Sequence, residues 1–141
     1  MVDCAGWGQY PKSIADAGQS GVQADSQNNI MFSIHMYEYA GAYGAVQNNI
    51  DSSLAVGAPL CIGEFGIKHT NGPIDYKTIM SYSQAKGVGY LSWSWKGNSS
   101  ELAYLDMVQD WAGTQLTEQG NAILNDQNGI KNTSKSCSIF E

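Results

Sequence analysis

The chain has few positive charges and no long apolar run. Its 141 residues include seven Lys plus Arg against thirteen Asp plus Glu, which gives a formal net charge of −6. Nucleic-acid binding and attachment to an acidic membrane surface both rely on clustered basic residues, so we expect neither partner. A membrane-spanning helix needs about 18 consecutive apolar residues, and no segment approaches that length. The opening "MVDCAGWGQY" also lacks the charged and apolar regions of a signal peptide, so a soluble chain is expected.

Cysteine is scarce as well. Cys4, Cys61 and Cys137 are widely spaced and odd in number. Disulfide frameworks and zinc sites use paired or closely spaced cysteines, so neither is indicated. We therefore expect core or free thiols, no metal and no cofactor.

Four apolar segments recur at nearly regular intervals and predict strands. Their starts lie roughly 30 residues apart, which is the length of one strand–helix unit. A complete eightfold barrel uses about 250 residues, or about 31 for each unit, so this chain provides about four and a half. We expect one domain spanning residues 1–141. The predicted strands cover residues 1–5, 30–37, 59–65 and 88–95.

Helical patterns fill the segments between these strands. Pro11 suits the first turn of a helix over residues 10–25, and Asp75 suits the cap of a helix over residues 75–89. Two further helices are predicted over residues 44–58 and 116–126. Alternating strands and helices imply parallel βα units. The pattern alone allows either a small open α/β sheet or half of a barrel.

Glu64 stands at the end of an otherwise apolar strand, "PLCIGEF". Because side chains alternate along a strand, Glu64 is expected to share a face with Leu60 and Ile62. The active site of a parallel barrel lies at the carboxyl ends of its strands, where the following loops converge. Glu64 is therefore a candidate functional carboxylate, although a lone glutamate at the end of a strand is as often simply solvated.

Polar and aromatic residues also end the neighbouring predicted strands. His35 and Tyr37 are two residues apart in "FSIHMYEY", so both can reach one bound group. Trp93 lies in "GYLSWSWKGN", with Asn98 just beyond, and an aromatic ring at a barrel mouth can stack on the apolar face of a sugar. Each residue alone is as compatible with ordinary core packing. Their shared position at the ends of successive strands favours a site.

Five motifs of the chain stand in a fixed order: "FSIHMYEYAG", "IGEFGIKHTNG", "GYLSWSWKGNSSELAYLD", "DWAG" and "LTEQGNAI". Together they closely resemble the carboxyl-terminal half of bacterial endo-β-1,4-mannanases of glycoside hydrolase family 5. The opening "VDCAGWGQYPKSI" is similar to that family's fifth strand and the loop after it. The resemblance covers nearly the whole chain. It implies an α/β fold that is half of a (β/α)8 TIM barrel, with strands five to eight and their helices. It also implies an extracellular enzyme that cleaves internal β-1,4 bonds of mannan with retention.

The resemblance assigns roles to the candidate residues. Glu64 matches the nucleophile of the family's I-G-E-F-G motif. His35 and Tyr37 match catalytic residues of the sixth strand, where the tyrosine hydroxyl keeps the nucleophile ionised and correctly turned. Trp93 matches the tryptophan that supports the sugar at the cleaved bond, and Asn98 matches a substrate-contacting position.

Retention needs a second carboxyl group about 5 to 5.5 Å from the nucleophile to serve as acid and base. In the family this glutamate follows an asparagine on the fourth strand, and no such Asn-Glu pair occurs here. Glu38 is the nearest substitute, but its period-two position points away from the face of Glu64. Ile67 and Lys68 also depart from the family, which commonly has a histidine and an arginine there.

Half a barrel leaves an apolar inner face and two sheet edges without partners. We predict that this inner face includes Leu60, Ile62, Leu91 and Trp93, and that a second copy or a complementary amino-terminal half-barrel covers it. Three hypotheses remain for the function. The chain is a mannanase half that needs its complement, a non-catalytic module that binds mannan or mannooligosaccharide, or an inactive fragment.

Overall fold

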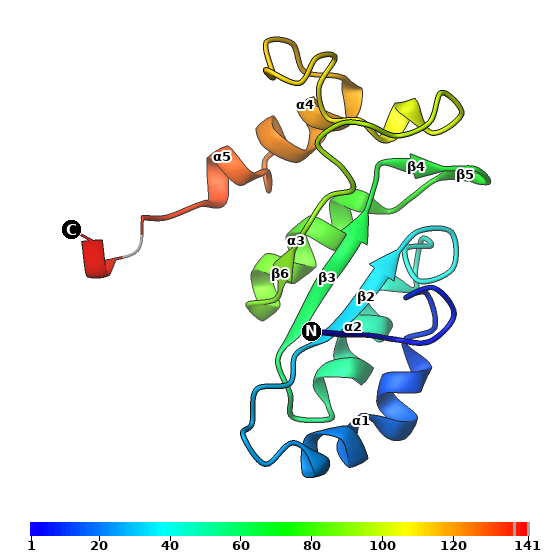
Figure 1. Ribbon diagram of the computed structural model, residues 1–141, viewed down its shortest axis with the longest axis vertical. Coiled ribbons are helices and arrows are strands. Elements are labelled where there is room, and N and C mark those ends of the chain that lie inside the picture. Colours follow the sequence, from blue (N-terminus) through cyan, green and yellow to red (C-terminus); the bar gives the residue numbers. More distant parts are fainter. Residues whose placement is uncertain (137, 141) are drawn as a thin grey trace. The chain divides into compact units, whose positions relative to one another are not determined.

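The computed structural model describes residues 1–136 and 138–140, and the chain divides into two compact units, Met1–Trp93 and Ser94–Glu141. The first unit is built on a parallel sheet whose strand order, β1-β2-β3-β6, follows the order along the chain (Figure 1). Each predicted strand is present, although the outer two are short. The strands are β1 (Val2–Asp3), β2 (Phe32–Met36), β3 (Leu60–Phe65) and β6 (Gly89–Tyr90).

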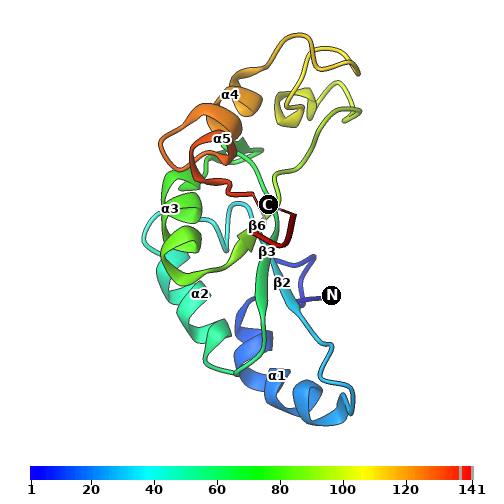
Figure 2. The same cartoon turned by 90° about the vertical axis from the view of Figure 1, so that its left-hand side faces the viewer.

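Three helices connect these strands and lie on one side of the sheet (Figure 2). A doubly wound open sheet has helices on both faces, whereas a barrel has its helices on the outer face alone. The arrangement therefore resolves the two alternatives that the sequence left open, and the fold is half of a (β/α)8 barrel. The helices are α1 (Lys12–Ala24), α2 (Val46–Leu54) and α3 (Tyr76–Lys86).

The predicted helix boundaries are confirmed within a few residues. Pro11 immediately precedes α1, and the Asp75 side chain accepts a hydrogen bond from the Thr78 amide at the start of α3. Gly87 ends α3 in a left-handed conformation, with φ 68°, which a glycine adopts without steric cost. Helix α1 is continuous across Gly18 and Gly21, although glycine is a poor helix former.

The helix-covered face of the sheet forms the core of the first unit. Ile34, Met36, Ile62 and Phe65 on the two central strands are 0% exposed. Ile34 pairs with Ile62 across β2 and β3, so the two side chains lie on the same face. The apolar strand segments therefore supply a core that is complete within the first unit.

A β-bulge corrects the predicted faces of β3. Ile34 pairs with Ile62, but the next pair is His35 with Glu64, so Gly63 and Glu64 both lie opposite His35. The extra residue shifts the alternation, and Glu64 faces the side of His35 instead of the side of Ile62. Consequently Leu60 and Ile62 belong to the helix-covered face. Their predicted place on the inner face of the barrel was wrong.

The first unit also contains a small hairpin that the sequence did not reveal. Strands β4 (Lys68–His69) and β5 (Gly72–Pro73) pair in antiparallel fashion just after β3. In the second unit, the Thr117 side chain caps helix α4 (Glu118–Asn125) by accepting from the Gly120 amide at 3.1 Å. This unit also holds η1 (Ala103–Leu105), α5 (Ile130–Thr133) and η2 (Ser138–Phe140).

Cys4 and Cys61 are free and buried, and burial raises the pKa of both thiols. Both match the expectation of core thiols, while Cys137 lies outside the described residues. Among the described residues, no helix is both long enough and apolar enough to cross a membrane. Within that same part of the chain, no three His, Cys, Asp or Glu residues are grouped as metal ligands.

Candidate active site

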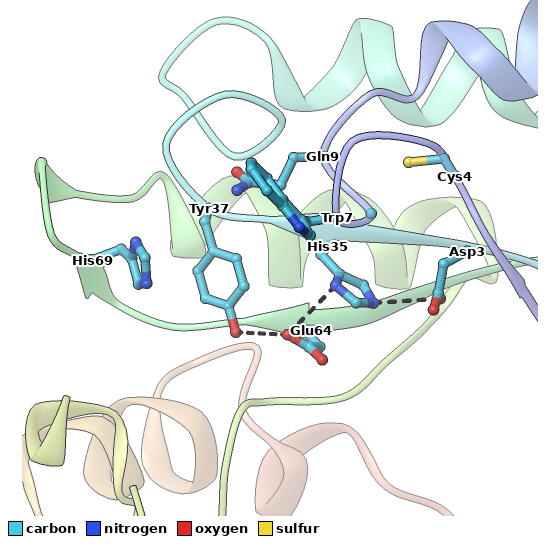
Figure 3. Close-up of a pocket in the computed structure, with 9 residues that line it drawn as sticks. Asp3, Cys4, Trp7, Gln9, His35, Tyr37, Glu64 and His69 are labelled. Carbon is cyan, nitrogen blue, oxygen red and sulfur yellow. Dashed lines mark hydrogen bonds and ion pairs between the residues drawn. The ribbon is translucent and has the colours of Figure 1, made fainter. Parts of the chain in front are cut away.

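A pocket of about 520 Å³ opens where β1, β2 and β3 end, within the first unit (Figure 3). Three of the five predicted site residues line it, and the loop after β1 and the β4 hairpin complete it. The lining residues are Asp3, Cys4, Trp7, Gly8, Gln9, His35, Tyr37, Glu64 and His69.

Two side chains of β2 and its following loop converge on the Glu64 carboxylate (Figure 3). The Tyr37 hydroxyl donates a hydrogen bond to Glu64 Oε2 at 3.1 Å, and His35 Nδ1 lies 3.5 Å from the same oxygen. Both contacts therefore fall on Oε2. The Glu64 side chain is 26% exposed, so its other oxygen can face a molecule in the pocket.

The imidazole of His35 lies between two carboxylates. Its Nε2 is 3.3 Å from Asp3 Oδ1, on the side of the ring away from Glu64. The backbone amide of His35 donates to the Gly8 carbonyl at 2.6 Å, and a Cβ on Gly8 would come within 2.4 Å of the ring. Glycine is therefore required at position 8, where the backbone packs against the ring and fixes its plane.

Gly63 is required for a related reason. A Cβ at this position would lie 2.2 Å from Ser33 Oγ, well inside van der Waals contact. The absence of a side chain allows β3 to form its bulge against β2, and the bulge turns Glu64 toward His35. The glycine before the glutamate thus has a structural explanation that the sequence pattern did not supply.

His69 packs against the Tyr37 ring, and Glu38 pairs with His69. The His69 ring lies 4.7 Å from the Tyr37 ring, centroid to centroid, and its Nδ1 is paired with Glu38 Oε1. Burial raises the pKa of the Glu38 carboxyl, but hydrogen bonds from His69 and from backbone amides outweigh it and hold that pKa below its usual range. A general acid needs a raised pKa, so this environment does not suit Glu38 to the role of a general acid.

The two predicted substrate contacts, Trp93 and Asn98, do not line this pocket. Trp93 ends the first unit just after β6, is 43% exposed, and its amide donates to the Phe65 carbonyl at 3.0 Å. Asn98 belongs to the second unit, where its side-chain amide donates to Asp106 Oδ1 at 2.7 Å and to Ser94 Oγ at 3.1 Å. The amide of Asn98 therefore organises the loop that contains it.

Six of the nine pocket residues were not identified as site residues from the sequence, and besides Cys4 and Gly8 these are Asp3, Trp7, Gln9 and His69. Asp3 ends the first strand, so the rule that led to His35 and Glu64 applies to it as well. Trp7 stands between two glycines, a pattern typical of an unusual backbone conformation. His69 and Gln9 carried no recognisable signal, because each reaches the pocket through a loop geometry that no local pattern specifies.

The family model for cellulases, glycosyl hydrolase family 5, matches residues 1–99. A mannan endo-1,4-beta-mannosidase from Salipaludibacillus agaradhaerens is 54% identical over 99% of this chain, which corresponds to 46% of that relative. A second mannan endo-1,4-beta-mannosidase, from Cellvibrio japonicus, is 41% identical over 99% of the chain and 33% of its own length.

Solved structures give the same result. The catalytic domain of a mannanase from Streptomyces sp. SirexAA-E superposes on this chain with a TM-score of 0.89 at 35% sequence identity. The matched region covers 99% of this chain and 45% of the mannanase chain. The mannohexaose complex of Thermomonospora fusca beta-mannanase superposes with a TM-score of 0.87 at 35% identity, over 99% and 46%. The chain therefore spans less than half the length of these relatives.

Proposed function

Because this chain belongs to glycosyl hydrolase family 5, we propose that it supplies the nucleophile half of a retaining endo-β-1,4-mannanase. The single observation that carries the proposal is the convergence of Tyr37 and His35 on one oxygen of the Glu64 carboxylate. The names of the relatives support mannan as the substrate class. The whole of residues 1–141 belongs, in this proposal, to one partial catalytic domain.

In the proposed mechanism, Glu64 attacks the anomeric carbon while the bond from that carbon to the leaving sugar's oxygen breaks, and the acid/base carboxyl group gives that oxygen its proton. Water, activated by the same acid/base group, then cleaves the covalent glycosyl intermediate and frees Glu64. Tyr37 and His35 hold Oε2, which leaves Oε1 as the attacking oxygen. The hydroxyl of Tyr37 stabilises the ionised carboxylate and fixes its rotation. Asp3 fixes the imidazole of His35 through Nε2, so that Nδ1 stays directed at Glu64. Trp93 and Asn98 remain proposed substrate contacts on the strength of the family motif alone.

The acid/base carboxyl group must come from elsewhere, because a retaining mechanism cannot proceed with Glu64 alone. In the proposal, a complementary half-barrel or a second copy of the chain covers the open inner face of the sheet. Leu91 on that face is 54% exposed and Trp93 is 43% exposed, so apolar surface is available for association. A complementary half is the occupant that also completes the active site.

Complementation tests the proposal directly. The chain is co-expressed with a polypeptide carrying strands one to four of the 54% identical relative, and this mixture is called the complemented sample below. We expect release of reducing sugar from mannan by the complemented sample and little from the chain alone. Sedimentation velocity measures the mass of each. Full activity of an isolated monomer would contradict both the proposed nucleophile half and the proposed association.

Carbohydrate binding without hydrolysis is the second candidate function. The pocket and the exposed Trp7 side chain that lines it favour this binding function, since both suit a bound sugar whether or not cleavage follows. Calorimetry with mannohexaose separates the two. Binding by the chain, together with a complemented sample that assembles but does not hydrolyse mannan, would select this second function. The same extracellular setting is proposed for either.

A further inference from the structure

Trp7 combines extreme exposure with an unfavourable backbone conformation. Its side chain is 93% exposed, more than any other large hydrophobic residue that the structure describes. Its φ is 54°, and the neighbouring Gly6 and Gly8 have φ values of 63° and 74°. Glycine adopts this left-handed region readily, whereas a bulky residue is strained there. Strain of this kind persists where surrounding structure enforces it, and it concentrates at functional sites.

The loop that carries Trp7 is held rigidly. The Gly8 amide donates to the Cys4 carbonyl at 3.1 Å, and the Tyr10 amide donates to the Ala5 carbonyl at 3.0 Å. The Gly8 carbonyl also accepts the His35 amide, which ties the loop to β2 beside the pocket. The indole therefore projects from a fixed backbone, although its own side chain gains almost no burial in return.

The position of Trp7 relates it to the candidate nucleophile. Trp7 lines the same pocket as Glu64 and reaches it from the loop after β1 (Figure 3). Strand β3, which carries Glu64, pairs with β2 on one side and with β6 on the other, and β1 lies beyond β2. Trp93 follows β6, so the two tryptophans approach from opposite sides of the nucleophile strand. Adjacent strands are about 4.8 Å apart, which places β1 about 10 Å from β3.

We propose that Trp7 is a stacking platform for a pyranose ring of the bound polysaccharide, on the leaving-group side of the bond that Glu64 attacks. The proposal rests on the proposed function, in which Trp93 supports the sugar at the cleaved bond. A polysaccharide chain that crosses the ends of the strands then passes Trp93, Glu64 and Trp7 in that order. Sugar rings present apolar C–H faces, and a rigid exposed indole matches them without an ordering cost at the moment of binding.

Stability and binding respond in opposite directions if this assignment is correct. Replacing Trp7 with glycine removes the strained conformation at little cost in buried apolar surface, so Trp7→Gly is expected to keep or raise the midpoint of thermal unfolding. The same variant loses the stacking surface. A residue whose removal spares the fold and harms the binding of ligand is retained for function.

Calorimetric titration of the chain with mannohexaose tests the proposal. We expect Trp7→Gly and Trp7→Ala to weaken binding by about tenfold, and Trp7→Phe to retain most of it because a ring remains. Tyr43→Ala is the matched control, since Tyr43 is 67% exposed and does not line the pocket. That control is expected to bind as the unaltered chain does.

Three results would overturn the assignment: equal binding by Trp7→Ala and the unaltered chain, no binding by the unaltered chain, or a lowered unfolding midpoint in Trp7→Gly. The last result would make Trp7 a structural residue. The proposed function is judged separately, by Glu64-dependent hydrolysis in the complemented sample. If hydrolysis depends on Glu64 while mannohexaose binding is unaffected by substitution of Trp7, the proposed function is supported and the proposed role of Trp7 is contradicted.

Discussion

The two faces of the β1-β2-β3-β6 sheet differ in composition and in completeness. The helix-covered face presents Ile34 and Ile62, both 0% exposed, and its core is closed within the first unit. The opposite face presents His35 and Glu64, and its apolar Leu91 is 54% exposed. One face therefore supplies the stability of the fold. The other holds the proposed nucleophile and, in the proposed function, needs a partner for its completion.

The largest expected effect is that of Glu64→Gln, which should lower hydrolysis without lowering stability and so distinguish the two faces of the sheet. The substitution removes the proposed nucleophile while keeping nearly the same shape, so hydrolysis by the complemented sample should fall by about a thousandfold or more. Thermal unfolding should change little, because the Glu64 side chain is partly exposed at the pocket. Glu101→Gln is the control for charge loss, since Glu101 is exposed in the second unit. Retained hydrolysis in Glu64→Gln would remove Glu64 from the mechanism.

A core substitution on the helix-covered face should have the opposite profile. Ile62→Ala opens a cavity beside Ile34 and should lower the free energy of unfolding by about 2 to 5 kcal/mol. Leu91→Ala on the open face should cost less than about 1 kcal/mol, because Leu91 is already half exposed in the chain alone. Urea unfolding of the three chains measures both values. Equal losses would mean that the two faces are equally packed.

Gly63 links the two faces, because its bulge decides which of them Glu64 joins. Gly63→Ala places a methyl group against Ser33 Oγ, so we expect the free energy of unfolding to fall by about 1 to 3 kcal/mol. We also expect a loss of mannan hydrolysis in the complemented sample that is larger than this loss of stability alone explains. Ser33 is 0% exposed and its hydroxyl has no hydrogen-bond partner among the described residues, so Ser33→Ala alone should be neutral or stabilising. The double variant should recover part of both losses. Additive losses in a double-mutant cycle would contradict the proposed contact.

Sequence patterns predicted the strands and helices of the first unit, because apolar periodicity and capping residues such as Asp75 are local signals. The shared face of Glu64 with Leu60 and Ile62 was predicted wrongly, since alternation along a strand assumes regular pairing and a bulge depends on the neighbouring strand. The meeting of His35, Tyr37 and Glu64 follows from the rule for parallel strand ends. Contacts made through loops, such as that of His69 with Tyr37, depend on tertiary geometry that no local pattern encodes.

His69 tests how far the open face depends on support from a loop. His69→Ala removes the ring packed on Tyr37, so the tyrosine hydroxyl should hold Glu64 less firmly. We expect kcat in the complemented sample to fall by about tenfold with KM nearly unchanged, as for a group that acts on the transition state. His69→Phe keeps the ring and should recover part of kcat, although the pairing with Glu38 is lost. Unchanged kcat in His69→Ala would show that Tyr37 needs no support.

Substitution of Asp106, in the second unit, is expected to have the smallest effect of those considered. Its carboxylate contributes to stability alone and so provides a comparison with Glu64. Burial raises the pKa of Asp106, but hydrogen bonds from Lys96 and Asn98 outweigh it and hold the pKa below its usual range. A lowered folded-state pKa contributes stability that is present above the unfolded value, about 3.9, and is lost as pH falls through the folded value. The unfolding free energy of the chain should therefore decline below about pH 4, and Asp106→Asn should flatten that decline. Asp16→Asn is the control, because Asp16 pairs with Lys12 on an exposed surface of α1. An identical acid slope in Asp106→Asn and the unaltered chain would contradict a stabilising role for this carboxylate.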